Sequence, residues 1–189
     1  AYYYGEGRRS DRFVGEQPRG QHRPEKVLEE ILAPREKPVF FKDMAYHAAG
    51  FMDREFAARF ANTFLIREPG QALASLYRMW PDFTFEEAGY ERLHRLYDYA
   101  VEAGQEPVVV DAADLTANPE GTVAAYCGAL GIPFKPEALS WEPRRVPGWE
   151  VWEEWHTEAQ NSTGISEVPE TDAPLPPELQ ETYERCRPY

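Results

Sequence analysis

The sequence predicts an α/β fold in which a parallel β-sheet carries helices on both of its faces. Three short apolar runs indicate strands, at residues 38–41, 63–66 and 107–111, and helical patterns separate them. Alternation of strand and helix along a chain is typical of a parallel sheet, because each parallel neighbour needs a crossover connection. The length of 189 residues and an apolar fraction of 42% suit a single domain over residues 1–189.

The first part of the chain predicts an irregular segment, a helix and a strand. Residues 1–23 are rich in Gly, Arg and Tyr and show no periodicity, so we expect an irregular lead-in. Pro24 then opens a short helix that ends at Ala33–Pro34. The run 38–41 predicts a buried parallel strand, with the polar residues 42–47 at its carboxyl end.

The middle of the chain predicts a second strand between helices. A brief helix is expected over residues 53–60, and the strand 63–66 follows it. Pro69 suits the first turn of the next helix, because the backbone N–H that proline lacks would have no helical partner there. Thr84-x-x-Glu87 has the pattern of a capping box, and we expect it to begin the longest helix, which ends at Gly104.

The third strand leads into the C-terminal part of the chain. A helix follows this strand, opened by Pro119 and closed by Gly131, and completes an expected α/β core over residues 24–139. Residues 140–170 are dense in Pro and Trp and have weak periodicity, whereas residues 171–189 predict a tail with one short helix.

The composition excludes several classes of function. A formal net charge of −13 disfavours broad binding to nucleic acid or to an anionic membrane, since both need basic surface. No apolar run approaches the roughly 18 residues of a membrane helix. Cys127 and Cys186 are too few for a disulfide framework and have no metal-ligand spacing. We therefore expect a cytoplasmic protein without a metal; the sequence leaves the oligomeric state open.

Polar side chains follow the predicted strands at the edge where ligands of open parallel sheets bind. The segments concerned are 42–47, 67–75 and 111–114. Arg67 offers a planar fork of donors and Ser75 a hydroxyl, and together they suit a phosphate. The alternative is that Arg67 pairs with a carboxylate and that Ser75 simply lies on a helix face.

Three segments of the chain carry a resemblance to a known family. Phe64-Leu65-Ile66-Arg67-Glu68-Pro69, with Ser75-Leu76-Tyr77 after it, resembles the 3′-phosphate-binding segment of sulfotransferases that use 3′-phosphoadenosine 5′-phosphosulfate (PAPS). The resemblance implies that Arg67 and Ser75 hold the 3′-phosphate. The strand and helices over residues 108–133 are similar to the same family, with Asp111 where cytosolic members usually carry an adenine-contacting Tyr.

The third segment, residues 144–157, looks like the loop that closes over the donor in this family. The resemblance implies that Arg144 and Arg145 contact the 3′-phosphate and that Trp152, seven residues after Arg145, lies beside the nucleotide. The usual Lys-Gly after the second arginine is absent. The alternative for the tryptophans is an aromatic cluster beneath a loop.

The resemblance also implies parts that these residues do not contain. The family has the fold of P-loop nucleotide-binding proteins, and its first strand ends in a phosphate loop that grips the 5′-phosphosulfate. No Gly-x-x-x-x-Gly-Lys-Ser/Thr pattern or equivalent occurs in this sequence. We therefore expect the first strand and the phosphate loop upstream of Ala1. The implied cofactor is PAPS, with 3′,5′-adenosine bisphosphate as product and no metal.

The implied reaction transfers the sulfuryl group to a hydroxyl of a small-molecule acceptor. Such a transfer needs in-line positioning, cations for the leaving group and a base for the hydroxyl. The family's base is commonly a His just after the strand that corresponds to residues 39–41, with a Lys before it that reaches the donor. Lys42 fits that Lys, and His47 is the nearest imidazole, so we expect His47 to be the base, with Asp43 as the fallback.

Two other functions remain open at this point. A P-loop kinase-like phosphotransferase would need the same upstream loop and an acidic residue for Mg²⁺, for which Asp111 is suitably placed. A non-catalytic nucleotide-binding or regulatory module would keep the 3′-phosphate pocket without the donor loop.

Overall fold

The computed structural model describes residues 24–48, 50–147, 149–150, 153–167 and 174–189. Its contacts group the chain into two compact units, one formed by Ala1–Asp43 with Pro143–Asn161 and the other by Met44–Glu142 with Ser162–Tyr189. We call them the first unit and the second unit. The single domain over residues 1–189, with its expected subdivisions, stays a prediction.

The second unit is built on a parallel pair of strands. β1 (Thr63–Ile66) lies beside β2 (Val108–Asp111), with Thr63 opposite Val108 and Ile66 opposite Asp111. Two of the three runs predicted as strands, 63–66 and 107–111, therefore form a parallel pair. Because the two strands are parallel and in register, the residues that follow Ile66 and Asp111 leave the same edge of the sheet.

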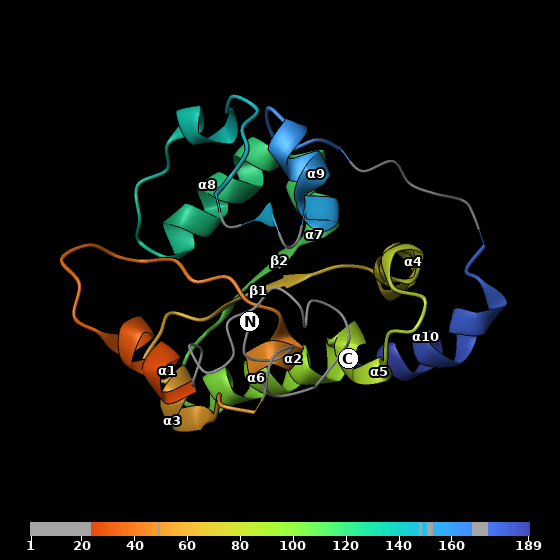
Figure 1. Cartoon of the computed structure of the whole chain (residues 1–189). Coiled ribbons are helices and arrows are strands. Elements are labelled where there is room, and N and C mark those ends of the chain that lie inside the picture. Colours follow the sequence, from red (N-terminus) through yellow and green to blue (C-terminus); the bar gives the residue numbers. More distant parts are fainter. Residues whose placement is uncertain (1–23, 49, 148, 151–152, 168–173) are drawn as a thin grey trace. The chain divides into compact units, whose positions relative to one another are not determined.

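Helices cover both faces of this pair (Figure 1). On one face, α6 (Tyr90–Glu102) packs its Leu96 and Ala100 against Phe64 of β1. Two short helices, α2 (Ala45–Ala48) and α3 (Arg54–Ala57), pack against α6 in turn.

The other face of the pair carries the two helices that follow β2. These are α7 (Ala112–Ala117) and α8 (Pro119–Ala129), and both contact β2. Pro119 stands at the first turn of α8 and Gly131, with a φ of +66°, lies just past its end, as the sequence predicts. The predicted α/β architecture, a parallel sheet flanked by helices, is confirmed for the described residues.

A second core lies beside the helix that follows β1. α4 (Pro69–Met79) contributes Leu73, which packs with Leu179 and Cys186. Leu179 ends the 3₁₀ turn η4 (Pro177–Leu179), and Cys186 ends α10 (Gln180–Cys186). The final short helix predicted from the sequence is thus present, and it is anchored on α4.

The predicted start of the longest helix is wrong in one respect. The capping box of Thr84 and Glu87 forms, but it begins the four-residue helix α5 (Phe85–Ala88). Gly89 then takes the left-handed conformation, with a φ of +85°, and α6 starts afresh at Tyr90. A cap satisfies the N–H groups of one turn only, so it cannot determine how far the helix continues.

The described part of the first unit contains two helices, α1 (Pro24–Leu32) and α9 (Glu153–Asn161). α1 agrees with the prediction, whereas α9 was not predicted. The strand expected at residues 38–41 is wrong, because residues 38–44 have no regular secondary structure and Phe40 is 72% exposed. An apolar run becomes a strand only when another strand bonds its backbone, and local composition does not specify that neighbour.

Within the second unit, the segments that precede and follow α9 in the sequence pair through their backbones. Ser140 and Gly164 form an isolated antiparallel bridge, and the backbone N–H of Trp141 donates to the carbonyl of Thr163. The 3₁₀ helix η2 (Pro136–Leu139) precedes this bridge. Among the described helices, α6 is the longest at 13 residues, and none meets the length and apolarity that crossing a bilayer requires.

Candidate active site

The turn between β1 and α4 is defined by three consecutive residues. Arg67 directly follows β1, Glu68 is the N-cap of α4, and Pro69 occupies its first turn. The Glu68 carboxylate accepts a hydrogen bond of 2.8 Å from the backbone N–H of Gln71, which satisfies one of the free donors at the helix start. Arg67 therefore lies at the carboxyl edge of the sheet, as predicted.

The Arg67 side chain has no polar partner among the residues that the structure describes. It is partly buried, and its guanidinium forms no hydrogen bond or salt bridge with the residues that the structure describes. The alternative of an Arg67–carboxylate pair is therefore not seen in this part of the chain. Ser75 lies on the helix that starts two residues after Arg67 and is also partly buried. Their joint contact with a phosphate stays a prediction.

A residue that sequence reasoning missed holds the backbone of this turn. The hydroxyl of Tyr90 donates a hydrogen bond of 2.8 Å to the carbonyl oxygen of Arg67, 23 residues earlier in the chain. Burial raises the pKa of Tyr90, so its hydroxyl remains a donor at neutral pH. No local pattern could have revealed this contact, because the two residues meet only through packing.

Asp111 has a structural role at the same edge of the sheet. Its carboxylate accepts a hydrogen bond of 2.8 Å from the backbone N–H of Ala113 and caps α7. Within the described ranges, no group of three or more His, Cys, Asp or Glu residues is placed to hold a metal ion.

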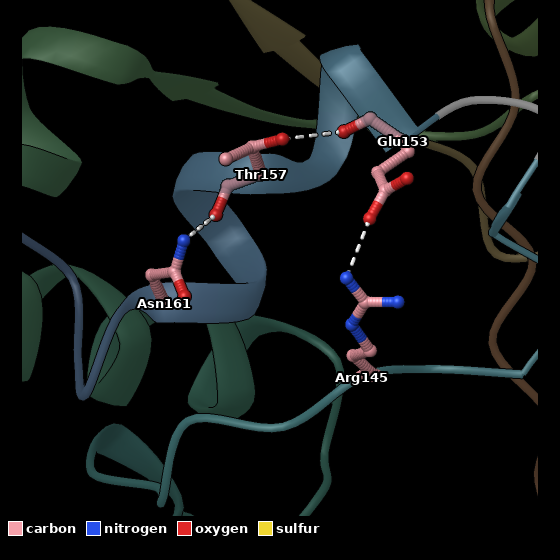
Figure 2. A network of polar contacts seen from close by, with 4 residues as sticks. All are labelled: Arg145, Glu153, Thr157 and Asn161. Carbon is pink, nitrogen blue, oxygen red and sulfur yellow. Dashed lines mark hydrogen bonds and ion pairs between the residues drawn. The ribbon is translucent and has the colours of Figure 1, made fainter.

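In the first unit, the predicted basic pair lies beside α9. Nη2 of Arg145 is 3.0 Å from Oε1 of Glu153, and the backbone N–H of Arg144 donates to the carbonyl of Gln160 at 3.0 Å. Figure 2 shows this ion pair together with two hydrogen bonds inside α9, from Thr157 to the Glu153 carbonyl and from Asn161 to the Thr157 carbonyl.

The basic pair borders a hollow of about 300 Å³. Its lining consists of side chains from the segment before α9 and from α9 itself: Pro143, Arg144, Arg145, Glu153, Thr157, Gln160 and Asn161. The side chains of Arg145 and Glu153 are 87% and 55% exposed, so water screens their attraction. An anion can therefore compete with Glu153 for Arg145 at small cost.

The aromatic residues of the predicted donor-lid segment are only partly described. Trp152, which the resemblance places beside the nucleotide, lies outside the described residues. The ring of Trp149 packs on His156, with centroids 4.1 Å apart and an angle of 31° between the rings. This contact agrees with an aromatic cluster for Trp149.

The three predicted catalytic residues divide between the two units. Lys42 and Asp43 are exposed and belong to the first unit, in the segment without regular structure. His47 belongs to α2 of the second unit, where its ring packs edge-on against Tyr46 and its Nε2 atom is shielded from solvent. Their catalytic roles stay predictions.

Two curated proteins of Arabidopsis thaliana, named branched-chain-amino-acid aminotransferase-like protein 2 and protein 1, are 29% and 28% identical over 167 residues, or 87% of this chain. The chain spans 30% of the length of each of them. Among solved structures, the sulfotransferase domain from the curacin biosynthetic pathway is similar at a TM-score of 0.42 and 19% identity, over 86% of this chain and 66% of that chain.

One family of domains matches almost the entire sequence. A family model described as a sulfotransferase domain covers residues 9–182. The match extends beyond the segments that carry the resemblance and includes both units of the structure. The chain therefore belongs to the sulfotransferase domain family.

Proposed function

We propose that this chain takes part in a PAPS-dependent sulfotransferase that transfers the sulfuryl group to a hydroxyl of a small molecule. Family membership supports the reaction class. The observation that carries the choice of donor is Arg67, a partly buried guanidinium at the carboxyl edge of a parallel sheet without an ion-pair partner among the described residues. Such a site suits a phosphate dianion, which accepts bidentate hydrogen bonds.

The chemical character of the predicted residues fits this nucleotide. Arg67 and Ser75 supply a charged fork and a hydroxyl from one turn and its helix, and the resemblance assigns Arg144 and Arg145 to the same 3′-phosphate. The hollow beside Arg145 is lined by both arginines and by amide and hydroxyl side chains, which suits an anionic group. PAPS supplies the activated sulfuryl group; the residues named here would bind and orient it and exclude other nucleotides.

The acceptor hydroxyl needs a base and a positioned leaving group. We propose His47 as the base, with Asp43 as the fallback, and Lys42 as a cation that reaches the donor. An imidazole accepts a proton readily near neutral pH, whereas an exposed carboxylate such as that of Asp43 is a weak base. His47→Ala is expected to lower turnover by about 10²-fold, and retention of more than a tenth of wild-type turnover would exclude His47 from this role.

The names of the two Arabidopsis relatives suggest a different chemistry, that of aminotransferases. These names belong to proteins of which this chain spans 30%. The family match extends over residues 9–182 of the chain itself and is therefore the stronger guide to its function.

The proposal is tested by calorimetric titration of the full-length protein with 3′,5′-adenosine bisphosphate and with 5′-AMP, which lacks the 3′-phosphate. The wild type should bind the bisphosphate more tightly. Arg67→Ala should weaken that binding by about 10- to 100-fold, because a charged hydrogen-bonding partner contributes about 1.5–3 kcal/mol, and should leave 5′-AMP binding unchanged.

The matched control is Arg78→Ala, on the exposed surface of the same helix. It removes the same charge and should leave both affinities unchanged. Equal affinity of the wild type for the two nucleotides would refute the proposed donor site. Equal losses in the two variants would mean that net charge, rather than a specific contact, governs binding.

A further inference from the structure

The hydrogen bond between Tyr90 and Arg67 joins two segments that are distant in sequence at the edge of the proposed nucleotide site. The Tyr90 hydroxyl reaches the carbonyl oxygen of Arg67 at 2.8 Å. Tyr90 is the first residue of α6 and follows Gly89, whose φ of +85° turns the chain between α5 and α6. A side chain at Gly89 would be strained in this conformation, so the approach of Tyr90 depends on that glycine.

Packing holds the ring of Tyr90 in place. It contacts the second core cluster, which contains Leu73 of α4 together with Leu179 and Cys186 near the C-terminal end of the described chain. The phenol is therefore anchored by α4 and α10, while its hydroxyl extends to the turn before α4. A ring anchored in this way fixes the position of the carbonyl that it bonds.

The titratable groups around the phenol come from the turn and from α10. Burial raises the pKa of Tyr90 most, Cys186 of α10 and then Glu68 raise it further, and Arg67 lowers it. The Glu68 carboxylate is directed to the backbone N–H of Gln71. The charge of Arg67 thus lowers the pKa of the phenol whose hydroxyl bonds the Arg67 carbonyl.

Two residues, Arg67 and Glu68, join β1 to the first turn of α4. Proline restricts its own φ and keeps the preceding residue extended, and Glu68 accordingly has a ψ of 127°. Arg67 directly follows β1, and its ψ is a rotation that Pro69 does not restrict. That rotation moves the carbonyl that Tyr90 bonds, and it changes the direction of the Arg67 side chain relative to α4.

We propose that Tyr90 is a positioning residue, whose hydroxyl holds the Arg67 carbonyl and thereby orients the Arg67 guanidinium toward a 3′-phosphate. The inference rests on the proposed function, since Arg67 is the residue expected to bind that phosphate. Tyr90 itself touches neither donor nor acceptor in this proposal. It acts by fixing the backbone of the residue that does.

The test compares two variants that each lose one phenolic hydroxyl. Tyr90→Phe removes the bond to Arg67, and Tyr126→Phe removes the contact of 3.3 Å with the hydroxyl of Thr63, at the opposite end of β1. Calorimetry with 3′,5′-adenosine bisphosphate and 5′-AMP measures the preference for the 3′-phosphate. Hydrogen exchange in the ligand-free protein measures protection of residues 68, 70 and 71.

Tyr90→Phe should lower the preference for the bisphosphate about fivefold, the equivalent of one hydrogen bond, and should speed exchange at residues 68, 70 and 71. Tyr126→Phe should change neither. An unchanged preference in Tyr90→Phe, or an equal loss in both variants, overturns the inference. If the wild type shows no preference, the proposed function fails. The inference then fails with it, and faster exchange in Tyr90→Phe would show only that Tyr90 holds the turn.

Discussion

Replacing Glu153 by glutamine is expected to strengthen the binding of 3′,5′-adenosine bisphosphate. Glu153 pairs with Arg145 at 3.0 Å, and a phosphate that binds Arg145 must displace it. The two side chains are 87% and 55% exposed, and ion pairs in such surroundings contribute only about 0.2–1 kcal/mol. Because about 1.4 kcal/mol corresponds to a tenfold change in affinity, the gain should not exceed about fivefold.

The assay is calorimetric titration at low ionic strength, where the attraction between exposed charges is screened least. Glu154→Gln is the matched control, since Glu154 is an exposed neighbour in the same first turn of α9. Both variants remove one negative charge near the start of the helix, so they share any loss of helix stability. Weaker binding by Glu153→Gln, or an equal gain in the control, would refute the idea that Glu153 competes for Arg145.

Two further predictions concern stability. Leu73 is 1% exposed, so Leu73→Ala should lower the free energy of unfolding, measured by urea denaturation, by about 2–5 kcal/mol. Leu65 is 57% exposed, so the control Leu65→Ala should lower it by less than about 1 kcal/mol. Similar losses would contradict the burial of Leu73. Burial raises the pKa of Tyr90, so at alkaline pH the folded protein keeps a phenolic proton that the unfolded chain has lost. The contribution of Tyr90 to the free energy of unfolding is therefore complete below about pH 10 and falls by about 1.4 kcal/mol per pH unit above it. Denaturation at a series of alkaline pH values should show a shallower decline for Tyr90→Phe, and equal slopes would contradict this reasoning.

Local sequence signals predicted most of the individual elements correctly. Pro69 and Pro119 each stand in the first turn of a helix, and Gly131 lies just past the end of one. These signals act within three or four residues, because helix ends depend on a few backbone N–H and C=O groups. The strands at residues 63–66 and 108–111 were likewise evident from their β-branched and aromatic content.

Sequence patterns whose structure depends on a distant partner did not predict that structure correctly. The run 38–41 has the composition of a strand, but it forms none in the structure. The capping box at Thr84 begins a helix of four residues instead of the longest one. In both cases the extent or the pairing of the element depended on packing elsewhere.

In the candidate site, too, some residues were identified from the sequence and others only from the structure. Arg67 and Ser75 were identified from their place after a strand and on the next helix, and Arg144 and Arg145 from a family resemblance. Tyr90 and Glu153 were found only in the structure, because each acts on a residue that the sequence does not place beside it.

The sequence by itself thus determined the α/β class, most helix and strand boundaries, and the arginines expected to bind an anion. Only the tertiary structure decided which strands pair, where the helix after Thr84 is interrupted, and which side chains hold Arg67 and Arg145. The physical reason is the range of the interactions involved. Caps and turns form between neighbours in the chain, whereas the hydrogen bond from Tyr90 to Arg67 spans 23 residues and exists only once α4, α6 and α10 have packed together.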